Sequence, residues 1–167
     1  MKLAKTIKSA LAAASVGFLA LGLAPTAAVA ATATTTFAVT ATVQATCSVS
    51  ATAMGFGTYV STAASLTTST VTVTCTNTTP YTVGLNAGTT SGATVTTRQM
   101  VNGSALLNYA LYSDSSRTIN WGNTTGSWVA GTGNGAAQAL TVYGEVAANQ
   151  YVTPGSFTDT ITATVTY

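Results

Sequence analysis

The sequence predicts an all-β protein, a β-sandwich of immunoglobulin-like type, on three observations. Stretches in which apolar and polar residues alternate recur along the chain, and this period of two is typical of half-buried strands. Turn residues separate the stretches at fairly regular spacing, and no helical period appears beyond the N-terminal region. Cys47 and Cys75 each lie on the apolar side of such a stretch, so a disulfide between two strands is expected inside the sandwich.

Residues 1–30 are expected to be an export signal and not part of the fold. They combine three lysines in the first eight positions, an apolar run over residues 10–23 and a small-residue cleavage motif at residues 28–30. The run is shorter than the roughly 20 residues that cross a bilayer, so no retained membrane segment is expected. The mature chain would begin at Ala31.

The mature chain carries very little charge. Arg98 and Arg117 stand against Asp114, Glu145 and Asp159. This balance excludes nucleic acid as an expected partner, because phosphate binding needs a basic patch. A surface with so few charges suits a polymer or extracellular matrix better than a free monomer.

The longest alternating stretch spans residues 34–49. Its odd positions from Phe37 onward are apolar and most of its even positions are Thr, Ser or Gln. The stretch exceeds the typical strand length of about 5–6 residues. We therefore predict that its first half leaves its own domain and completes the sheet of a neighbour, since strand addition to an open edge is an established binding mode.

The remaining predicted strands are shorter. Their ranges are residues 55–60, 71–75, 81–85, 106–112, 119–121, 140–146 and 158–167. Residues 87–97 are expected to form a loop or a weak hairpin, and Asn102-Gly103 a hairpin turn. The glycine-rich residues 126–135 are expected to be a mobile segment in which Trp128 is the one fixed side chain.

The last predicted strand has an exposed edge. One of its sides is formed by Phe157, Ile161, Ala163, Val165 and Tyr167. Edge strands are normally protected by charge or by a cover, yet residues 160–167 carry no charge and nothing follows them in this sequence. An uncharged open edge of this kind implies a partner.

Pairing of Cys47 with Cys75 is the expected state of two cysteines in an exported chain. Closing a loop of about 28 residues would stabilise the fold by roughly 3–4 kcal/mol. The alternative, a metal site, lacks ligands because the chain contains no histidine.

No catalytic, cofactor-binding or metal-binding residues are expected, and the protein is not expected to be an enzyme. The absence of histidine excludes the Ser-His-Asp and Cys-His arrangements and the usual zinc motifs. The carboxylates are interpreted as a turn former, Asp114, and strand-end charges. The arginines are expected to form surface ion pairs or to pin loops. Trp121, Trp128 and the tyrosines leave open a sugar-stacking face, although such residues more often pack in the core or at its rim.

The sequence resembles the spore coat protein U domain family, which includes subunits of archaic chaperone-usher pili. The resemblance rests on the order and spacing of short motifs over nearly all of the mature chain. These are Phe37-x-Val39, Cys47-Ser-Val, Phe56-Gly-x-Tyr59, Val71-x-Val73-x-Cys75, Pro80-Tyr81, Arg98-Gln-Met100, Leu107-x-Tyr109-x-Leu111-Tyr112, Trp121-Gly122, Tyr143-Gly144 and Pro154-Gly-x-Phe157-x-Asp159.

The resemblance implies an incomplete Greek-key sandwich of six strands, residues 46–167, preceded by a donor-strand extension, residues 31–45. A periplasmic chaperone would lend the missing strand first, and the extension of the next subunit would replace it at an outer-membrane usher. The donor side chains would be Phe37, Val39, Ala41 and Val43. The residues of the last predicted strand would border the acceptor groove. The small side chain of Ala41 departs from the pattern and indicates a shallow pocket or a different register.

The resulting hypothesis is an exported structural subunit of a surface pilus, with neighbouring subunits, chaperone and usher as partners and a role in adhesion and biofilm formation. With room for one domain, the chain is expected to be a shaft subunit. Two alternatives remain open: a spore or cell-surface coat protein that uses the same strand exchange, and a monomeric carbohydrate-binding module.

Overall fold

A computed structural model of the chain describes residues 29–167. The predicted export signal lies outside the described residues except for its last two positions. The chain divides between Thr40 and Ala41 into two parts, which are described separately. Residues 29–40 form no strand or helix and are exposed throughout. Nowhere in residues 29–167 is there a helix with the length and apolarity needed to cross a membrane.

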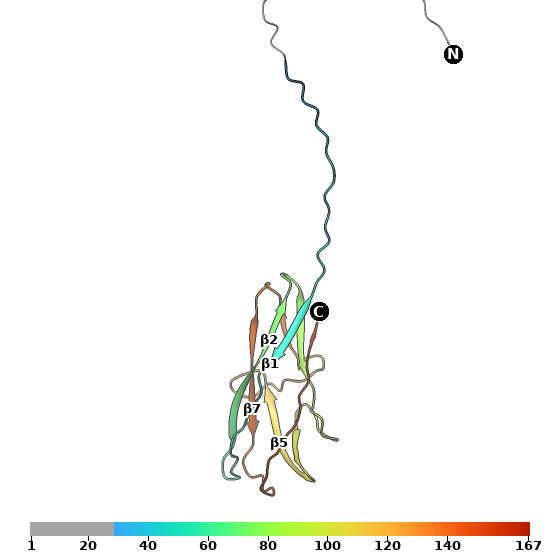
Figure 1. Cartoon of the computed structure of the whole chain (residues 1–167). Helices are drawn as coiled ribbons and strands as arrows, with labels where there is room; N and C mark the ends of the chain where they lie inside the picture. Colours follow the sequence, from blue (N-terminus) through green and yellow to red (C-terminus); the bar gives the residue numbers. More distant parts are fainter. Residues whose placement is uncertain (1–28) are drawn as a thin grey trace, which may run out of the picture. The chain divides into compact units, whose positions relative to one another are not determined.

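Residues 41–167 form an all-β fold of two antiparallel sheets, which confirms the predicted fold class (Figure 1). One sheet has the order β1-β2-β7-β5-β4 and the other the order β6-β3-β8. The strands are β1 Cys47–Ala51, β2 Ser65–Cys75, β3 Pro80–Leu85, β4 Arg98–Asn102, β5 Ala105–Tyr112, β6 Val129–Thr132, β7 Gln138–Val146 and β8 Ala163–Thr166. Strands distant in sequence pair in both sheets, as in β2 with β7 and β3 with β8.

The prediction of six strands was wrong, because the described residues form eight. The two strands without a counterpart in the prediction are short. β4 forms a hairpin with β5 across a two-residue turn in which Gly103 has a φ of 60°, a conformation that favours glycine. β6 lies in the glycine-rich segment that was expected to be mobile and pairs with β3 along its whole length. These two strands are explained by their hydrogen bonds to a neighbouring strand, because the local sequence pattern does not predict them.

Two other predictions about strands were also wrong. Residues 55–60 form no strand, and residues 119–121 contribute only one bridge, from Asn120 to Tyr112. The predicted strand at residues 71–75 is the second half of the longer β2, and the ladder of the last strand begins only at Ala163. The stretch at residues 34–49 contributes only the start of β1, from Cys47.

The disulfide between Cys47 and Cys75 is present and lies at the first pair of the β1–β2 ladder. Its position places the start of β1 at the same end of the sandwich as the turn from β2 to β3. The C-terminus lies at this end too, because Thr166 of β8 pairs with Thr82 near the start of β3 (Figure 1).

The interior contains a fully buried cation. Arg98 is 0% exposed, which corrects the expectation of a surface ion pair. Its guanidinium donates hydrogen bonds to the backbone oxygens of Asn86 at 2.8 Å, Val95 at 2.7 Å, Leu85 at 3.1 Å and Trp121 at 2.7 Å. Burial lowers the pKa of Arg98 to about 10, so it remains charged at neutral pH. Arg98 thus pins three separate segments from inside the fold.

Trp121, whose backbone oxygen accepts one of the Arg98 hydrogen bonds, is also buried in this part of the interior. It is 1% exposed, and its indole Nε1 donates a hydrogen bond of 2.8 Å to the backbone oxygen of Val83. Val83, on β3, is itself 0% exposed. We call Arg98, Trp121 and Val83 the closed region, because each side chain is enclosed and each of the donors described here has an acceptor.

Candidate functional site

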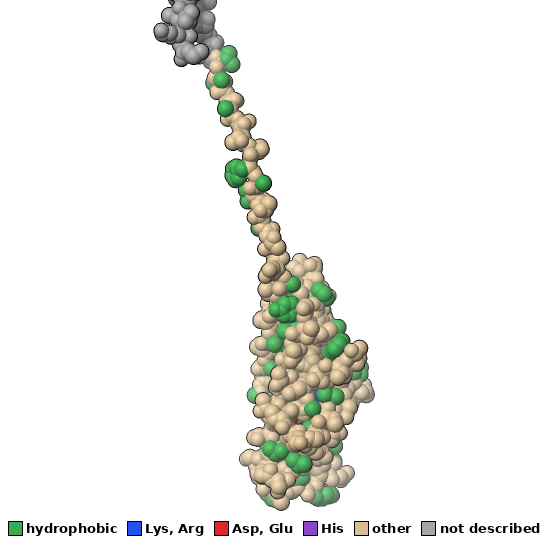
Figure 2. Space-filling view, turned by 90° about the vertical axis from the view of Figure 1, so that its right-hand side faces the viewer, with side chains coloured by type: hydrophobic (Ala, Val, Ile, Leu, Met, Phe, Trp, Pro, Cys, Tyr) green, Lys and Arg blue, Asp and Glu red, His purple; other side chains and the backbone are tan. Residues whose placement is uncertain are grey.

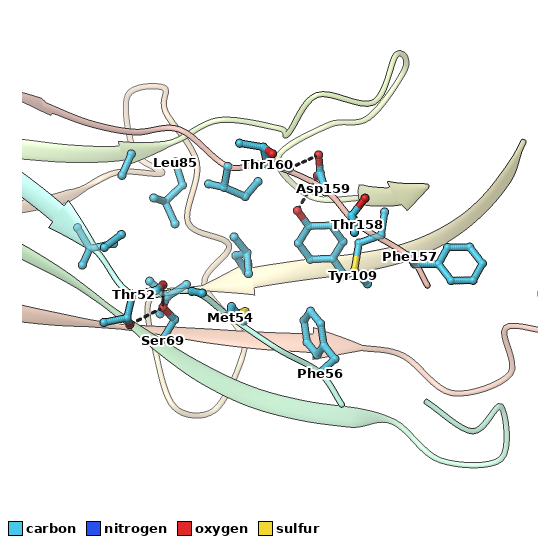
Figure 3. Close-up of a pocket in the computed structure, with 18 residues that line it drawn as sticks. Thr52, Met54, Phe56, Ser69, Leu85, Tyr109, Phe157, Thr158, Asp159 and Thr160 are labelled. Atoms are coloured by element: carbon cyan, nitrogen blue, oxygen red, sulfur yellow. Dashed lines mark hydrogen bonds between the residues drawn. The ribbon is translucent and has the colours of Figure 1, made fainter. Parts of the chain in front are cut away.

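A groove opens into the interior of the sandwich and encloses a cavity of about 400 Å³. Both sheets contribute to its floor, through Val71 of β2, Leu85 of β3, Leu111 of β5 and Val142 of β7. Its two walls are the chain that follows β1, residues 51–56, and the chain that leads into β8, residues 157–163. Figure 3 shows labelled side chains from both walls and from the strands between them. The lining is therefore mainly apolar, with polar groups along the walls.

The wall before β8 contains several of the residues expected at the groove edge. Phe157, Ile161 and Ala163 line the cavity, and every odd position from 157 to 165 is more buried than its even neighbours. Val165 packs against the core instead. Tyr167 is 59% exposed and does not line the cavity.

The opposite wall was not foreseen from the sequence. Met54 and Phe56 belong to a segment without regular structure, yet both pack against the core. Gly144 on β7 makes room for them, because a Cβ at that position would lie 2.5 Å from the Met54 sulfur and 3.0 Å from the Phe56 ring. Phe56 also meets the ring of Tyr109 edge-on, with centroids 5.9 Å apart. The Tyr143-Gly144 motif was the available signal, but only the fold shows what the glycine accommodates.

A polar cluster lies within this mainly apolar groove. The Asp159 carboxylate accepts hydrogen bonds from the Tyr109 hydroxyl at 2.7 Å, from the Thr89 backbone N–H at 2.9 Å and from the Thr160 backbone N–H at 2.7 Å. Figure 3 shows the Tyr109 hydroxyl pointing toward the Asp159 carboxylate. Asp159 was interpreted as a strand-end charge, although its place among alternating inward positions was a signal for this role.

The ionisation of this cluster follows from its contacts. Burial opposes ionisation of Asp159, but the hydrogen bonds from Thr89, Tyr109 and Thr160 outweigh it and lower the pKa of the carboxyl group. Burial and the bond to Asp159 raise the pKa of Tyr109 far above its ordinary value. At neutral pH the pair therefore consists of a carboxylate and a protonated phenol, which fixes Asp159 in the wall.

The chain at the groove edge also has unpaired backbone groups. Thr158 exchanges two backbone hydrogen bonds with Val101, and Asn86 donates one to Thr162. Thr158 therefore directs its backbone groups toward β4, and Thr162 directs its backbone oxygen toward the residue that follows β3. Because the direction alternates along an extended strand, the N–H and C=O groups of Ile161 and Ala163 face the other edge. Within residues 41–167, no strand pairs with β8 on that side.

The expected donor side chains lie on residues without regular structure. Phe37 is 85% exposed and Val39 is 83% exposed. Ala41 and Val43 precede β1, and Val43 is 87% exposed. These residues therefore form a run of exposed apolar side chains at alternating positions.

The surface gives little support to a sugar-stacking face built on both tryptophans. Trp121 is buried, and Trp128 is 39% exposed. Figure 2 shows scattered apolar patches and almost no charged side chains on one face.

Asp114 has the expected role of a turn former, since its carboxylate accepts hydrogen bonds from the backbone N–H groups of Thr118 and Ile119.

A second cleft, of about 800 Å³, continues from the groove beyond Phe157. The two share Met54, Phe56, Met100 and Phe157. The cleft extends to the loop at residues 150–156, where Tyr151 is 80% exposed. The groove is therefore open at the end that lies opposite to the disulfide.

Comparison with known proteins gives three consistent findings. The spore coat protein U domain matches residues 33–164. Protein U of Myxococcus xanthus is 40% identical over 86 residues, which are 50% of this chain and 48% of that protein. The fold is similar, with a TM-score of 0.57, to a chain in the chaperone–tip adhesion subunit pre-assembly complex, CsuC–CsuE, from archaic chaperone-usher Csu pili of Acinetobacter baumannii.

The extent of these matches differs. The structural similarity covers 75% of this chain and 41% of the solved chain at 21% sequence identity, so it concerns the fold. The chain spans about half the length of Protein U. The domain match, in contrast, covers most of the sequence, including residues 37–43 and both walls of the groove. This chain therefore belongs to the spore coat protein U domain family.

Proposed function

We propose that the chain is an exported structural subunit that polymerises by donor-strand exchange into a surface fibre. Phe37, Val39, Ala41 and Val43 of one copy would fill the groove of another copy. The observation that carries the proposal is the pairing of two features in one chain: an open apolar groove beside the unpaired edge of β8, and an N-terminal run of alternating apolar side chains with no cover.

The energetics are compatible with a stable contact. Burial of three larger apolar side chains contributes about 1.5–3 kcal/mol each, and pairing with the free backbone groups of β8 adds to this. Fixing the backbone of the extension costs roughly 1–2 kcal/mol per residue. The exchange forms no covalent bond and needs no catalytic group, so the proposal includes no enzymatic activity.

The proposed partners follow from the same groove. Before assembly its apolar lining would be exposed to solvent, so a periplasmic chaperone would cover it and an outer-membrane usher would replace the chaperone with the next subunit. The similar fold in a chaperone–subunit pre-assembly complex supports this order. The subunit would reach the cell surface, with residues 1–30 as export signal, and serve adhesion and biofilm formation.

The family suggests a second product of the same exchange, a coat or matrix layer. The matching domain takes its name from a spore coat protein, and Protein U supplies the sequence similarity. Fibre and coat share the subunit contact proposed here. Electron microscopy of the assembled material would separate a filament from a sheet or amorphous layer.

The test uses the mature chain, residues 31–167, and two variants of neighbouring residues in the extension. Val39→Asp places a carboxylate on a side chain that would enter the groove, and Thr40→Asp places the same group on one that would face solvent. We expect SDS-resistant ladders from the parent and from Thr40→Asp, and their loss in Val39→Asp, because a buried unpaired charge is strongly unfavourable. Equal behaviour of the two variants would refute donor-strand exchange.

A further inference from the structure

The direction in which a donor strand enters the groove is limited by the fold. β1 begins and β8 ends at the same end of the sandwich, whereas Phe157 lies at the other end of the groove. Three residues separate Val43 from Cys47, and four extended steps span at most about 14 Å. From Phe157 to Thr166 the distance is about 30 Å at the usual rise of a strand. A chain cannot place its own Val43 beside its own Phe157.

A second copy is free of this limit. Its extension can run antiparallel to β8, with Val43 near Phe157, and its folded part then lies beyond the open end of the groove, at the second cleft. The acceptor's own extension leaves from the opposite end and stays available for the next copy. This is a head-to-tail contact that can repeat from one copy to the next, whereas a chain that fills its own groove must run parallel to β8.

The register follows from a match of side chains. Four inward positions before and at the start of β8 line the groove, namely Phe157, Asp159, Ile161 and Ala163. The extension offers four at the same spacing, namely Phe37, Val39, Ala41 and Val43. An antiparallel match of the two sets places the largest donor side chain beside the smallest wall residue, Ala163. It also places the smallest donor side chain beside Asp159.

The second of these pairs explains the small side chain at position 41. Asp159 is held by Tyr109, Thr89 and Thr160, so it cannot turn away from an incoming side chain. A larger apolar group above it would remove water from a carboxylate, which is unfavourable. A register shifted by two residues would place Val39 or Val43 at this position.

We propose that the donor strand of a second copy runs antiparallel to β8 in the register that pairs Ala41 with Asp159 and Phe37 with Ala163. The inference rests on the proposed function and adds to it the register and a specificity-determining contact. Asp159 thereby acts as the wall position that accepts only a small side chain.

Cysteine pairs test the register directly. In this arrangement Ala38 of the donor lies opposite Thr162, and both side chains face away from the groove. The backbone groups of Thr162 face β3, so the pair is of the closer, non-hydrogen-bonded kind, at about 4.5 Å between Cα atoms, which permits a disulfide. We expect the mature chain with Ala38→Cys and Thr162→Cys to give ladders that survive boiling in SDS without reductant after mild oxidation.

Three matched pairs combine Ala38→Cys with Thr160→Cys, Thr164→Cys or Thr158→Cys. Preferential cross-linking at position 160 or 164 would overturn the register but leave strand exchange intact. Preferential cross-linking at position 158 would indicate a parallel strand, and a cross-link confined to monomers would indicate a self-filled groove. Failure of the parent chain to assemble would overturn the proposed function itself, and the register with it.

A second measurement addresses the contact at Asp159. We expect Ala41→Leu to lose most of the ladder that the parent forms, whereas Thr42→Leu retains it, because only the first change enlarges the side chain beside the carboxylate and Thr42 would face away from the groove. Equal ladders from the two variants would contradict the assignment of Asp159 as the position that selects a small side chain.

Discussion

The closed region and the groove occupy one sandwich but differ in how completely they are packed. In the closed region Arg98, Trp121 and Val83 are at most 1% exposed, and the buried donors reach backbone oxygens. In the groove Phe157 and Ile161 are only partly buried, although they pack against the same core. The first region is enclosed by the chain's own residues, whereas the second is open beside an edge of β8 that no strand of residues 41–167 pairs.

The largest expected effect belongs to the closed region. Arg98→Ala would leave buried backbone oxygens without donors and create a cavity, so we expect a loss of about 3–5 kcal/mol in the free energy of unfolding. Arg98→Lys should recover only part of this, because an ammonium group cannot reproduce the planar set of donors. Denaturant unfolding of a non-assembling chain that lacks residues 31–43 would measure both.

Arg117→Ala is the matched control for this change. Arg117 makes two hydrogen bonds of 3.4 Å and lies 5.8 Å from the centre of the Tyr143 ring, and it is not enclosed. We expect a loss below about 1 kcal/mol, as for most exposed substitutions. Similar losses from the two arginine variants would remove the distinction between the closed region and the rest of the fold.

A smaller and sharper contrast comes from two valines that pair across β3 and β8. Val83 is 0% exposed and Val165 is partly buried beside the free edge. In the same truncated chain Val83→Ala should cost about 2–3 kcal/mol and Val165→Ala about 1 kcal/mol, in proportion to the apolar surface each buries.

Addition of a peptide of residues 34–46 should raise the unfolding midpoint of the truncated chain and increase the cost of Val165→Ala, because a bound strand would cover that edge. The cost of Val83→Ala should not change. If the peptide stabilises neither variant, the edge of β8 is not a binding surface for the extension.

The smallest expected effect is on the loss of folding stability at acidic pH. The pKa of Asp159 is lowered in the folded chain, so folding favours its ionised form. Its contribution to stability is present above about pH 4, the ordinary range of an aspartate, and is lost as the pH falls through the folded-state pKa. We expect Asp159→Asn to show a shallower acid decline in unfolding midpoint than the parent. The remaining decline would come from Asp114, whose pKa the bonds from Ile119 and Thr118 also lower.

The alternation of apolar and polar residues was sufficient to predict the strands whose own sequence shows it. β3, β5 and β7 lie where period-two runs of Val, Leu and Tyr predict them. It was insufficient for β4 and β6, whose residues give no clear period. It also placed a strand at residues 55–60, where the chain has no strand and Phe56 lines the groove. In each of these cases the outcome depends on which neighbour the backbone meets, and a single sequence does not contain that information.

The residues of the candidate site also fall into two groups, those that the sequence pattern predicted and those that it did not. The inward face at Phe157, Ile161 and Ala163 was visible as alternation before a strand. The burial of Arg98 and the bond between Tyr109 and Asp159 join residues far apart in the chain, so they could not be derived from spacing. The pairing of extension and groove still depends on the resemblance to the family and on the proposals above.

The position of the disulfide has a mechanical consequence. Any pull on the extension reaches the sandwich at Thr46, which is hydrogen-bonded to Thr76, and at Cys47, the first residue of β1. Within residues 41–167, β1 is an edge strand whose ladder is with β2. Without a covalent link, such a pull would load the β1–β2 hydrogen bonds one after another from that end, as in peeling. Because the bond to Cys75 stands at the first pair, the force passes directly into β2, which β7 holds along most of its length. In a chain under tension, β1 would therefore stay in place.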